Sequence, residues 1–476
     1  MHLKTIQIRN FRCFEKLDLE LHPRLTVLVA ENGGGKSAVL DAIAVGLSPL
    51  LRYLSSANQR LSGPGIKDTD FRLEPWEDRG GIEKWGAADF AQIILQTTEG
   101  LRWDQWRGSS SGQQPTEKVG QTELANLISL TLASLKTGER KPLPVFAHYG
   151  ATRGWIEIPE RLRGSKVDYG HPTAALAESL TAISDFKEML NWFDSQESAE
   201  LRSNRGMSPE DWTPSSALEE VRESINKILG KEYVNPHFNE RHKFVVERKD
   251  GGILQVAQLS QGYQSMLAMA MDFARRLAIA NDHFAHMENT DEWASASDYY
   301  RNWGPEMEEG EELPLYGARW ARAIMLVDEI DLHLHPSWQQ RVLNDLMRAF
   351  PQTQFIVTTH SPQVVSTVRP ENIRIIQKLP DGAWITRKPD RNPYAHANSL
   401  SLEAVMGGDA YPALPLTEVL REYQRLVGAD QHDSARALEL RASLEKEWGK
   451  PDSELQIMDI AIRKNETLRK LRQEKA

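Results

Sequence analysis

Apolar and polar residues alternate near the start of the chain, in the stretch KTIQIRNFRCFEKLDLEL at residues 4–21. An apolar run, LTVLVA at residues 25–30, follows and leads into the glycine-rich segment ENGGGK. Alternation is typical of a half-buried strand, and a short apolar run is typical of a buried one. We therefore expect strands of an opening sheet, then a tight turn, then a helix that starts near Lys36.

The pattern becomes mixed between about residues 51 and 216, where loops with Pro and Gly separate short segments. FAQIILQTT is strand-like, LPVFAHYGATR is apolar and ISDFKEMLNWFD has helical spacing. Sheet-like sequence returns at residues 243–258, KFVVERKDGGILQVAQ. Its central Asp-Gly-Gly lies between two alternating runs and predicts a β-hairpin. A helix is expected from Gln261.

Two more apolar runs predict buried strands, AIMLVDE at residues 323–329 and QFIVTTH at residues 354–360. Between them PSWQQRVLNDLMRAF, residues 336–350, has the apolar spacing of an amphipathic helix, and Pro336 suits its first turn. Strand, helix and strand at this spacing predict a parallel βαβ unit. From about Leu400 onward the pattern is largely helical.

Composition indicates a globular protein, since 40% of the 476 residues are hydrophobic. A single cysteine, Cys13, excludes an internal disulfide, and the first residues lack the apolar segment of a secretory signal. Apolar runs fall short of the roughly 18 residues needed to cross a bilayer. We therefore expect a cytoplasmic protein with no membrane partner.

The charge of the chain does not decide which partners it binds. The formal net charge of −10 argues against a protein coated in positive potential, although a local basic groove can still bind nucleic acid. Residues 282–312 are strongly acidic, as expected of either a solvated insertion or a docking surface for a basic partner. Residues 459–476 are rich in Lys and Arg, which suits a solvated helix, a partner contact or a nucleic-acid contact.

The turn after residue 30 has the features of a phosphate loop, in which backbone N–H groups surround a phosphate and a lysine reaches its oxygens. A Ser hydroxyl at the start of the following helix binds Mg²⁺ in such loops. Ala30 replaces the first glycine of the pattern, and we expect it to be tolerated if its backbone is not left-handed. The candidate ATP ligands are Asn32, Gly33, Gly34, Gly35, Lys36, Ser37 and Ala38.

Acidic residues at the end of the 323–329 strand supply the other groups that nucleotide hydrolysis needs. Asp328 is the candidate magnesium ligand beside Ser37, and Glu329 is the candidate catalytic group that polarises the attacking water. His360 ends the next strand, where an imidazole could sense the γ-phosphate. Each of these residues alone could be an ordinary strand end, but together they favour the functional reading.

The segment LSQG precedes the helix expected from Gln261. Ser260, Gln261 and Gly262 would therefore lie at a helix N-terminus, which attracts anions through its dipole and its free N–H groups. An ordinary Ser N-cap is the alternative reading of this segment.

These four pieces, in this order, resemble the ATP-binding-cassette (ABC) ATPase superfamily in its non-transporter branch. IRNFRCFEKLDLEL resembles the starts of chromosome-maintenance and recombination ATPases, and VDEIDLHLHPSWQQ with QFIVTTHSPQV resembles the OLD-like AAA group of bacterial defence systems. LNWFDSQESAEL, LSQGYQSMLAMAMDFARRLA and the helical tail are similar to ATPase subunits of Septu-type anti-phage systems and of related retrons.

The resemblance implies an α/β fold: an ABC-type ATPase head, with a mixed sheet flanked by helices, large α+β insertions and a helical C-terminal region. Its core would comprise residues 1–50 and 241–395, the insertion residues 51–240 and the helical region residues 396–476. It further implies that ATP and Mg²⁺ bind, and that the chain forms a homodimer or higher homo-oligomer. In the ATP-dependent head-to-head association of this family, two heads stack in opposite directions, so Ser260, Gln261 and Gly262 would complete the site of a partner copy.

Two functions follow from the resemblance. The first is a defence ATPase that controls a separate HNH-type nuclease subunit, with nucleic acid contacted through the complex. The second is a DNA-repair or recombination clamp that acts directly on DNA. A transporter subunit fits poorly because DEIDLHLHP departs from the usual transporter run. The chain itself is not expected to be a nuclease, since no paired D-x-D acids follow Pro362.

One part of the expected site stays unassigned. The glutamine that supplies a second magnesium ligand in this family, on the Q-loop, has no clear counterpart after Leu51. Tyr149 and Arg153, in HYGATR, lie where related chains carry a short strand with Tyr and Arg. They could lie near the nucleotide, or they could serve ordinary packing.

Overall fold

The computed structural model divides into two compact units, Met1–Gly407 and Gly408–Ala476. It describes residues 1–56, 59–77, 83–110, 112–137, 141–154, 169–182, 186–229, 233–282, 317–395, 402, 405–406, 414–449 and 452–473. The acidic stretch predicted at residues 282–312 therefore lies, apart from Asp282, outside the described residues.

A six-stranded sheet forms the centre of the first unit, in the order β15-β14-β3-β13-β12-β8. β14, β3, β13, β12 and β8 run parallel to one another, and β15 is antiparallel at one edge. Every residue of β3, β8, β12 and β13 is buried, as expected of parallel strands covered on both faces. The strands are β3 (Leu25–Val29), β8 (Val145–Tyr149), β12 (Ala323–Val327), β13 (Thr353–Thr358), β14 (Ile373–Lys378) and β15 (Trp384–Arg387).

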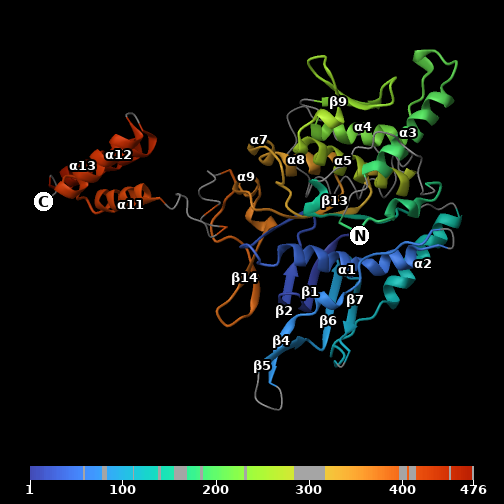
Figure 1. Ribbon diagram of the computed structural model, residues 1–476, viewed down its shortest axis with the longest axis horizontal. Coiled ribbons are helices and arrows are strands. Elements are labelled where there is room, and N and C mark those ends of the chain that lie inside the picture. Colours follow the sequence, from blue (N-terminus) through green and yellow to red (C-terminus); the bar gives the residue numbers. More distant parts are fainter. Residues whose placement is uncertain are drawn as a thin grey trace. The chain divides into compact units, whose positions relative to one another are not determined.

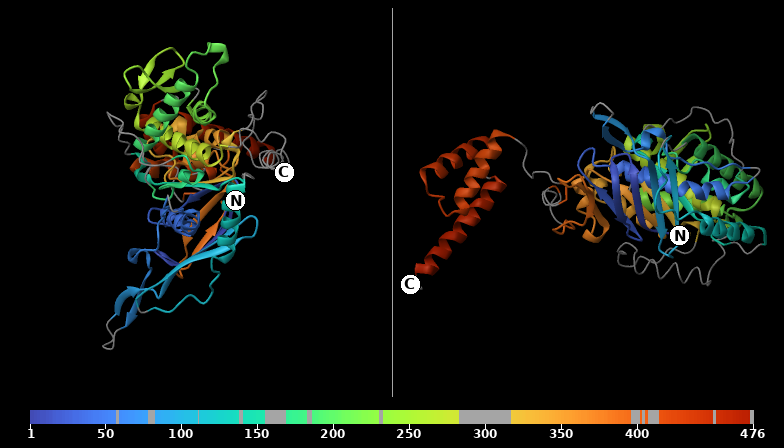
Figure 2. Two further views of the ribbon diagram at one scale, coloured as in Figure 1. Left: turned by 90° about the vertical axis from the view of Figure 1, so that its right-hand side faces the viewer. Right: turned by 90° about the horizontal axis from the view of Figure 1, so that it is seen from below.

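A second, antiparallel sheet has the order β2-β1-β6-β7. Its strands are β1 (Leu3–Phe11), β2 (Phe14–Glu20), β6 (Phe90–Thr97) and β7 (Arg102–Gly108). A hairpin of β4 (Leu73–Glu77) and β5 (Glu83–Ala87) projects from it (Figure 2). The strands expected within residues 4–21 and 90–98 thus pair with each other, because β1 lies between β2 and β6.

Helix α1 (Lys36–Leu54) packs against both sheets, contacting β13 of the first and β1, β6 and β7 of the second (Figure 1). By length and composition this helix is apolar enough to cross a membrane, contrary to our expectation from the sequence. However, 72% of its most apolar 18-residue stretch is buried inside the protein. Its apolar character is therefore explained by its place in the core. Trp103 on β7 donates a hydrogen bond to the carbonyl of Gly46 at 2.7 Å.

Helices cover the other side of the central sheet, together with a small sheet in the order β11-β10-β9. They include α3 (Phe186–Ser203), α4 (Ser216–Leu229) and α5 (Gln261–Ala280), while α2 (Thr122–Thr137) packs against α1. The strands are β9 (Tyr233–Phe238), β10 (Phe244–Arg248) and β11 (Ile253–Gln255). The predicted hairpin is confirmed, since β10 and β11 pair antiparallel and Gly251 at the turn has φ +93°.

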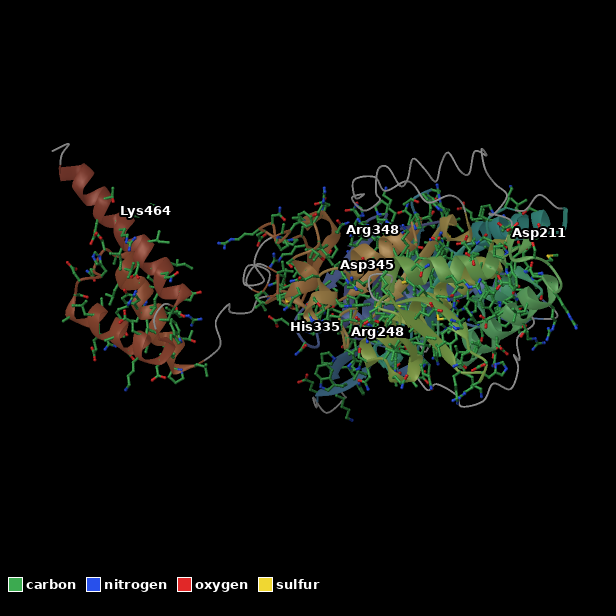
Figure 3. The ribbon with its side chains drawn as sticks, turned by 90° about the horizontal axis from the view of Figure 1, so that it is seen from above. Asp211, Arg248, His335, Asp345, Arg348 and Lys464 are labelled. Carbon is green, nitrogen blue, oxygen red and sulfur yellow. The ribbon has the colours of Figure 1, made fainter. Side chains whose placement is uncertain are left out.

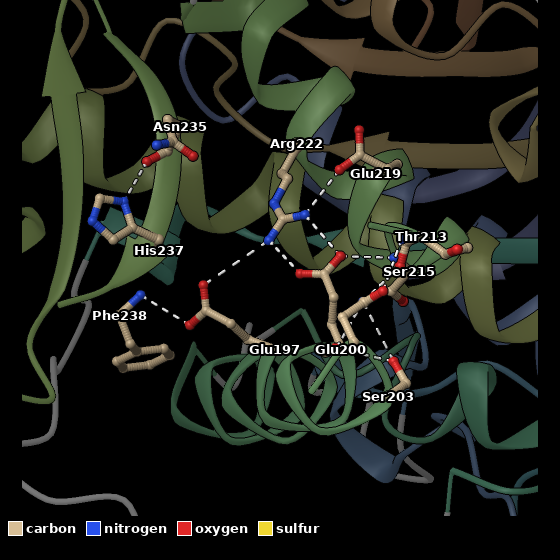
Figure 4. A network of polar contacts seen from close by, with 11 residues as sticks. Glu197, Glu200, Ser203, Thr213, Ser215, Glu219, Arg222, Asn235, His237 and Phe238 are labelled. Atoms are coloured by element: carbon tan, nitrogen blue, oxygen red, sulfur yellow. Dashed lines mark hydrogen bonds and ion pairs between the residues drawn. The ribbon is translucent and has the colours of Figure 1, made fainter. Parts of the chain in front are cut away.

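A polar network joins α3, α4 and β9 (Figure 4). Arg222 on α4 donates to both carboxylate oxygens of Glu200 on α3, at 3.2 and 3.0 Å, and also to Glu219 at 2.8 Å. Glu197, one turn before Glu200, accepts a hydrogen bond from the Phe238 amide at 3.1 Å. These bonds join α3, α4 and β9, all of which lie within the insertion expected at residues 51–240.

The parallel βαβ unit is confirmed, but its single expected helix is two: α7 (Pro336–Gln339) and α8 (Val342–Ala349). His335 caps α7 by accepting a bond from the Ser337 amide, and Asp345 lies on α8 (Figure 3). The buried Trp338 ring packs edge-on against Tyr263 of α5, with 4.4 Å between ring centroids. This long-range contact accompanies the break between the helices, and no sequence signal predicts it. A further short helix, α9 (Pro362–Val365), follows β13.

The second unit is helical, with α11 (Pro415–Gly428), α12 (Ala435–Trp448) and α13 (Ser453–Gln473). It has its own core of Leu420, Tyr423, Val427, Ala437, Leu440, Leu444 and Leu455. Arg441 on α12 donates to both carboxylate oxygens of Asp459 on α13, at 2.8 and 3.1 Å. The predicted helical C-terminal region is confirmed.

Replacing Gly46 with Val should lower the melting temperature. A Cβ at Gly46 would lie 2.7 Å from Leu95 Cδ1 and 3.1 Å from Ile93 Cγ2. Overpacking of this kind typically costs about 1–3 kcal/mol. Thermal denaturation checks the effect, and Gly65→Val is the matched control because a Cβ there meets nothing within 4 Å. Equal melting temperatures for the two variants would contradict the close packing of α1 on β6.

Candidate functional site

The glycine-rich turn between β3 and α1 requires its glycines for two different reasons. Gly33 and Gly35 have φ of +76° and +82°, a left-handed conformation that favours glycine. A Cβ at Gly34 would lie 2.6 Å from Ala30 Cβ and 2.9 Å from the Glu31 carbonyl oxygen. Ala30 does not have a positive φ, so its backbone is not left-handed. Its methyl group fits because Gly34, which lies against it, has no side chain.

Lys36 lies at the start of α1 and points back over this turn. Its ammonium donates to the carbonyl oxygens of Ala30 at 3.0 Å and Glu31 at 3.3 Å. Burial lowers the pKa of Lys36, while the charges of Asp328, Glu329 and Asp331 act in the opposite direction. The lysine and the acidic residues after β12 therefore face one another across the same site.

Thr358, the last residue of β13, holds the acidic turn that follows β12. Its hydroxyl donates to Asp328 Oδ1 at 2.6 Å and accepts from the Glu329 amide at 2.7 Å. Glu329 has φ +48°, an uncommon conformation for a residue with a side chain. The parallel pairing of β12 and β13, which places Val327 opposite Val357, puts the hydroxyl beside this turn.

His360 lies two residues beyond β13, at the same edge of the sheet. Its side chain is exposed, and its amide donates to Asp331 Oδ1 at 3.3 Å. Thr359 donates to the same oxygen at 2.6 Å. The structure thus brings the predicted phosphate loop, Asp328, Glu329 and His360 to one edge, because β3, β13 and β12 are neighbouring parallel strands.

The predicted LSQG segment lies at the start of α5. Ser260 is the N-cap residue, is exposed, and makes no capping hydrogen bond with its side chain. A Cβ at Gly262 would lie 2.5 Å from the His333 carbonyl oxygen, in the loop after the acidic turn. No hydrogen bond or ion pair between described residues joins Ser260, Gln261 or Gly262 to residues 30–38 of the same chain. The structure therefore does not complete a single site from both segments within one chain.

A buried ionic cluster, not predicted from the sequence, connects α5 with β8. The Tyr149 hydroxyl donates to Asp272 Oδ2 at 2.8 Å, and Arg275 and Arg276 donate to the same carboxylate at 2.6 and 2.8 Å. Burial alone would raise the pKa of Asp272, but the two arginines hold it below its ordinary value. The three charged residues lie within five positions on α5, which is a visible but unspecific signal in the sequence.

Arg153, just after β8, contacts the acidic turn directly. Its guanidinium donates to the main-chain carbonyls of Asp328 and Glu329, and to that of Gly150 at 3.2 Å. The side chain is buried. Of the two readings left open for Arg153 and Tyr149, the structure places Arg153 at the candidate site and Tyr149 in the cluster behind it.

Two family profiles match the chain, an "AAA domain" over residues 5–232 and an "AAA domain, putative AbiEii toxin, Type IV TA system" over residues 132–366. This chain carries an AAA-family ATPase domain. The two matched segments together include the phosphate loop, the LSQG segment, the acidic turn and His360.

Two of the curated proteins that this chain resembles are similar to it over almost its whole length. The Retron Ec83 probable ATPase of Escherichia coli is 27% identical, over 98% of this chain and 87% of its own length. The Retron Vc95 probable ATPase of Vibrio cholerae is 24% identical, over 94% of this chain and 88% of its own length. The Septu protein PtuA of Bacillus mycoides is 33% identical, over 23% of this chain and 16% of its own length.

The solved SMC head domain from Thermotoga maritima aligns with 82% of this chain and all of its own, at 13% identity and a TM-score of 0.32. A score this low has no weight in the assignment. The α/β fold with its mixed sheet is established by the strand order above.

Replacing Thr358 with Val should destabilise the protein, because the buried Asp328 loses a donor and the Glu329 amide loses its acceptor. Removing one partner of a buried hydrogen bond costs about 1–3 kcal/mol. Thr358→Ser keeps the hydroxyl and is the matched control. Thermal denaturation should place the serine variant clearly above the valine variant. The reverse order would show that the hydroxyl does not hold the acidic turn.

Proposed function

We propose that this chain binds ATP at the edge formed by β3, β12 and β13 and hydrolyses it there. The observation that carries the proposal is the convergence of a glycine-rich phosphate loop, two carboxylates and a histidine at the ends of three neighbouring parallel strands. The matched AAA domains and the relatives named as probable ATPases support it.

The residues of the loop divide the binding between them. The N–H groups of Gly33, Gly34 and Gly35 and the N-terminus of α1 would bind phosphate oxygens, as in other phosphate loops. Lys36 would exchange its bonds to the loop carbonyls for bonds to the β- and γ-phosphates. Asn32 and Ala38 stay predicted contacts at either end of the loop.

Ser37 and Asp328 fit a magnesium ion. Ser37 is exposed at the start of α1, and Asp328 uses Oδ1 for Thr358, while Oδ2 makes no hydrogen bond with the described residues. One hydroxyl and one carboxylate suit Mg²⁺, which takes few protein ligands and completes its shell with water and phosphate oxygens. When bound, the ion would neutralise charge on the phosphates.

Glu329 would act as the catalytic group. Its main chain is held by Thr358 and Arg153, while its side chain is only half-buried and points from a left-handed turn. In that position the carboxylate would polarise the water that attacks the γ-phosphate. His360, exposed beside Asp331, would contact the γ-phosphate.

A second copy of the chain would complete the site. The exposed Ser260 hydroxyl, at the N-terminus of the long helix α5, has no bond to its own chain's phosphate loop. A helix N-terminus with an uncommitted hydroxyl is suited to a phosphate. Head-to-head association would let Ser260, Gln261 and Gly262 reach the ATP bound by the partner copy.

The biological role proposed is anti-phage defence. The chain's similarity to retron ATPases and to PtuA of the Septu system supports a defence ATPase. We propose that ATP-dependent association of heads controls a separate HNH-type nuclease, since γ-phosphate contacts between chains are lost on hydrolysis.

Purified chain should hydrolyse ATP, and two substitutions should affect this differently. Glu329→Gln should still bind ATP but should lower kcat by about 100-fold or more, since general-base groups typically contribute 10²–10⁴-fold. Lys36→Ala should weaken ATP binding. Phosphate release measures the turnover of each variant, and binding of a fluorescent ATP analogue measures its affinity for ATP. Normal turnover by the glutamine variant would remove Glu329 from its role.

The defence role predicts that phage form fewer plaques on cells that carry the intact locus, and that Glu329→Gln changes this protection.

The purified chain alone should not cut DNA or RNA in the presence of Mg²⁺. Nuclease activity that co-purifies with the chain and is lost with Glu329→Gln in a partner-free preparation would contradict this division of labour. ATP hydrolysis stimulated by duplex DNA, with no effect on phage, would instead favour the repair clamp.

A further inference from the structure

The main chain of the acidic turn after β12 is held by an arginine that the sequence motifs do not include. The guanidinium of Arg153 makes three hydrogen bonds with described residues, and all three go to main-chain carbonyls: those of Gly150, Asp328 and Glu329. No ion pair between Arg153 and a carboxylate is found in the part of the chain that the structure describes. The side chain is 6% exposed.

A buried guanidinium of this kind is unusual, because buried charges are normally paired directly with an opposite charge. Burial lowers the pKa of Arg153 to about 10, while the nearby charges of Asp328, Asp331 and Glu329 act in the opposite direction. The group therefore stays charged at neutral pH. The acids balance its charge through space, while their side-chain oxygens are not used to bind it.

The conformation of Glu329 explains what the arginine does. A residue with a side chain in the left-handed region is strained relative to the usual helical region. Glu329 keeps φ at +48° because its amide is bound by Thr358 and its carbonyl by Arg153 and the Leu332 amide. One planar guanidinium reaches two successive carbonyls, a geometry that a lysine ammonium does not reproduce.

We propose that Arg153 is a positioning residue for ATP hydrolysis: it fixes the turn that aims Glu329, and it leaves both carboxylates free for the metal and the attacking water. This inference rests on the proposed ATPase function and adds to it a residue outside the phosphate loop, the LSQG segment and the acidic turn. Because Arg153 acts through the main chain, it affects the catalytic step and not the affinity for ATP.

The segment that carries Arg153 is itself anchored to α5. It follows β8 directly, and Tyr149 is the last residue of that strand. The Tyr149 hydroxyl donates to the buried Asp272 at 2.8 Å, and the Tyr149 carbonyl accepts a hydrogen bond from the Asp328 amide, also at 2.8 Å. β8 also pairs in parallel with β12, so Tyr149 lies opposite Val327. These contacts fix the position of the Arg153 guanidinium beside the acidic turn.

The test compares Arg153→Lys and Arg153→Gln with the unchanged chain. Both variants should lower kcat, the glutamine variant by about 10- to 100-fold, which corresponds to the loss of one or two charge-assisted hydrogen bonds. The dissociation constant for a fluorescent ATP analogue should stay within about threefold of the unchanged value, because phosphate-loop contacts are kept. Lysine should restore only part of the rate. Adding methylguanidinium to Arg153→Ala should raise kcat.

Arg24→Lys is the matched control. Arg24 is also a buried arginine that donates to main-chain carbonyls, those of Phe350, Thr353 and Met347, but it precedes β3 at the opposite end of the strands. This variant should lose thermal stability and keep the kcat of the folded protein. Melting curves for all variants separate a loss of fold from a loss of rate.

Three results would overturn the proposal: unchanged kcat in Arg153→Gln, a loss of ATP affinity as large as the loss of kcat, or an equal fall of kcat in Arg24→Lys. If Arg153→Gln does not fold, Arg153→Lys and the methylguanidinium rescue decide the question in the same way. Failure of the proposed function looks different, because the unchanged chain would then show no ATP hydrolysis at all.

Discussion

The parallel pairing of β3, β13, β12 and β8 is the constraint on which the site depends. These strands come from distant parts of the chain, yet their registers place their carboxyl ends at one edge of the sheet. The phosphate loop follows β3, His360 follows β13, the acidic turn follows β12 and Arg153 follows β8. Slippage of one strand would separate the groups, and complete burial of the strands on both faces disfavours slippage.

Two supports hold the acidic turn within that frame. Thr358 binds it from one neighbouring strand through a hydroxyl, and Arg153 binds it from the other side through a guanidinium. Neither support uses Asp328 Oδ2 or the Glu329 carboxylate in the described contacts. The arrangement therefore combines a fixed main chain with carboxylates that are available for chemistry, which is the preorganisation that catalytic sites require.

Local patterns predicted the parts of this site that depend on local structure. The apolar runs of β3, β12 and β13, the Asp-Gly-Gly hairpin and the phosphate loop each have a signal within a few residues. Contacts between distant residues had no such signal. They include Trp338 on Tyr263, Tyr149 with Asp272 and Arg153 with the Glu329 carbonyl. The apolar character of helix α1 was also not explained by local pattern, because it depends on the two sheets against which the helix is buried.

We propose that two copies of the chain share each ATP site, and co-expression of two inactive variants tests this most directly. Lys36→Ala removes the phosphate loop's cation, and Ser260→Glu places a negative charge on an exposed residue with no capping bond. Ser260 is preferable to Gly262, where any side chain would meet the His333 carbonyl. ATP hydrolysis by the mixed complex, absent from each variant alone, is the predicted result. No recovery at any ratio of the two chains would contradict a shared site.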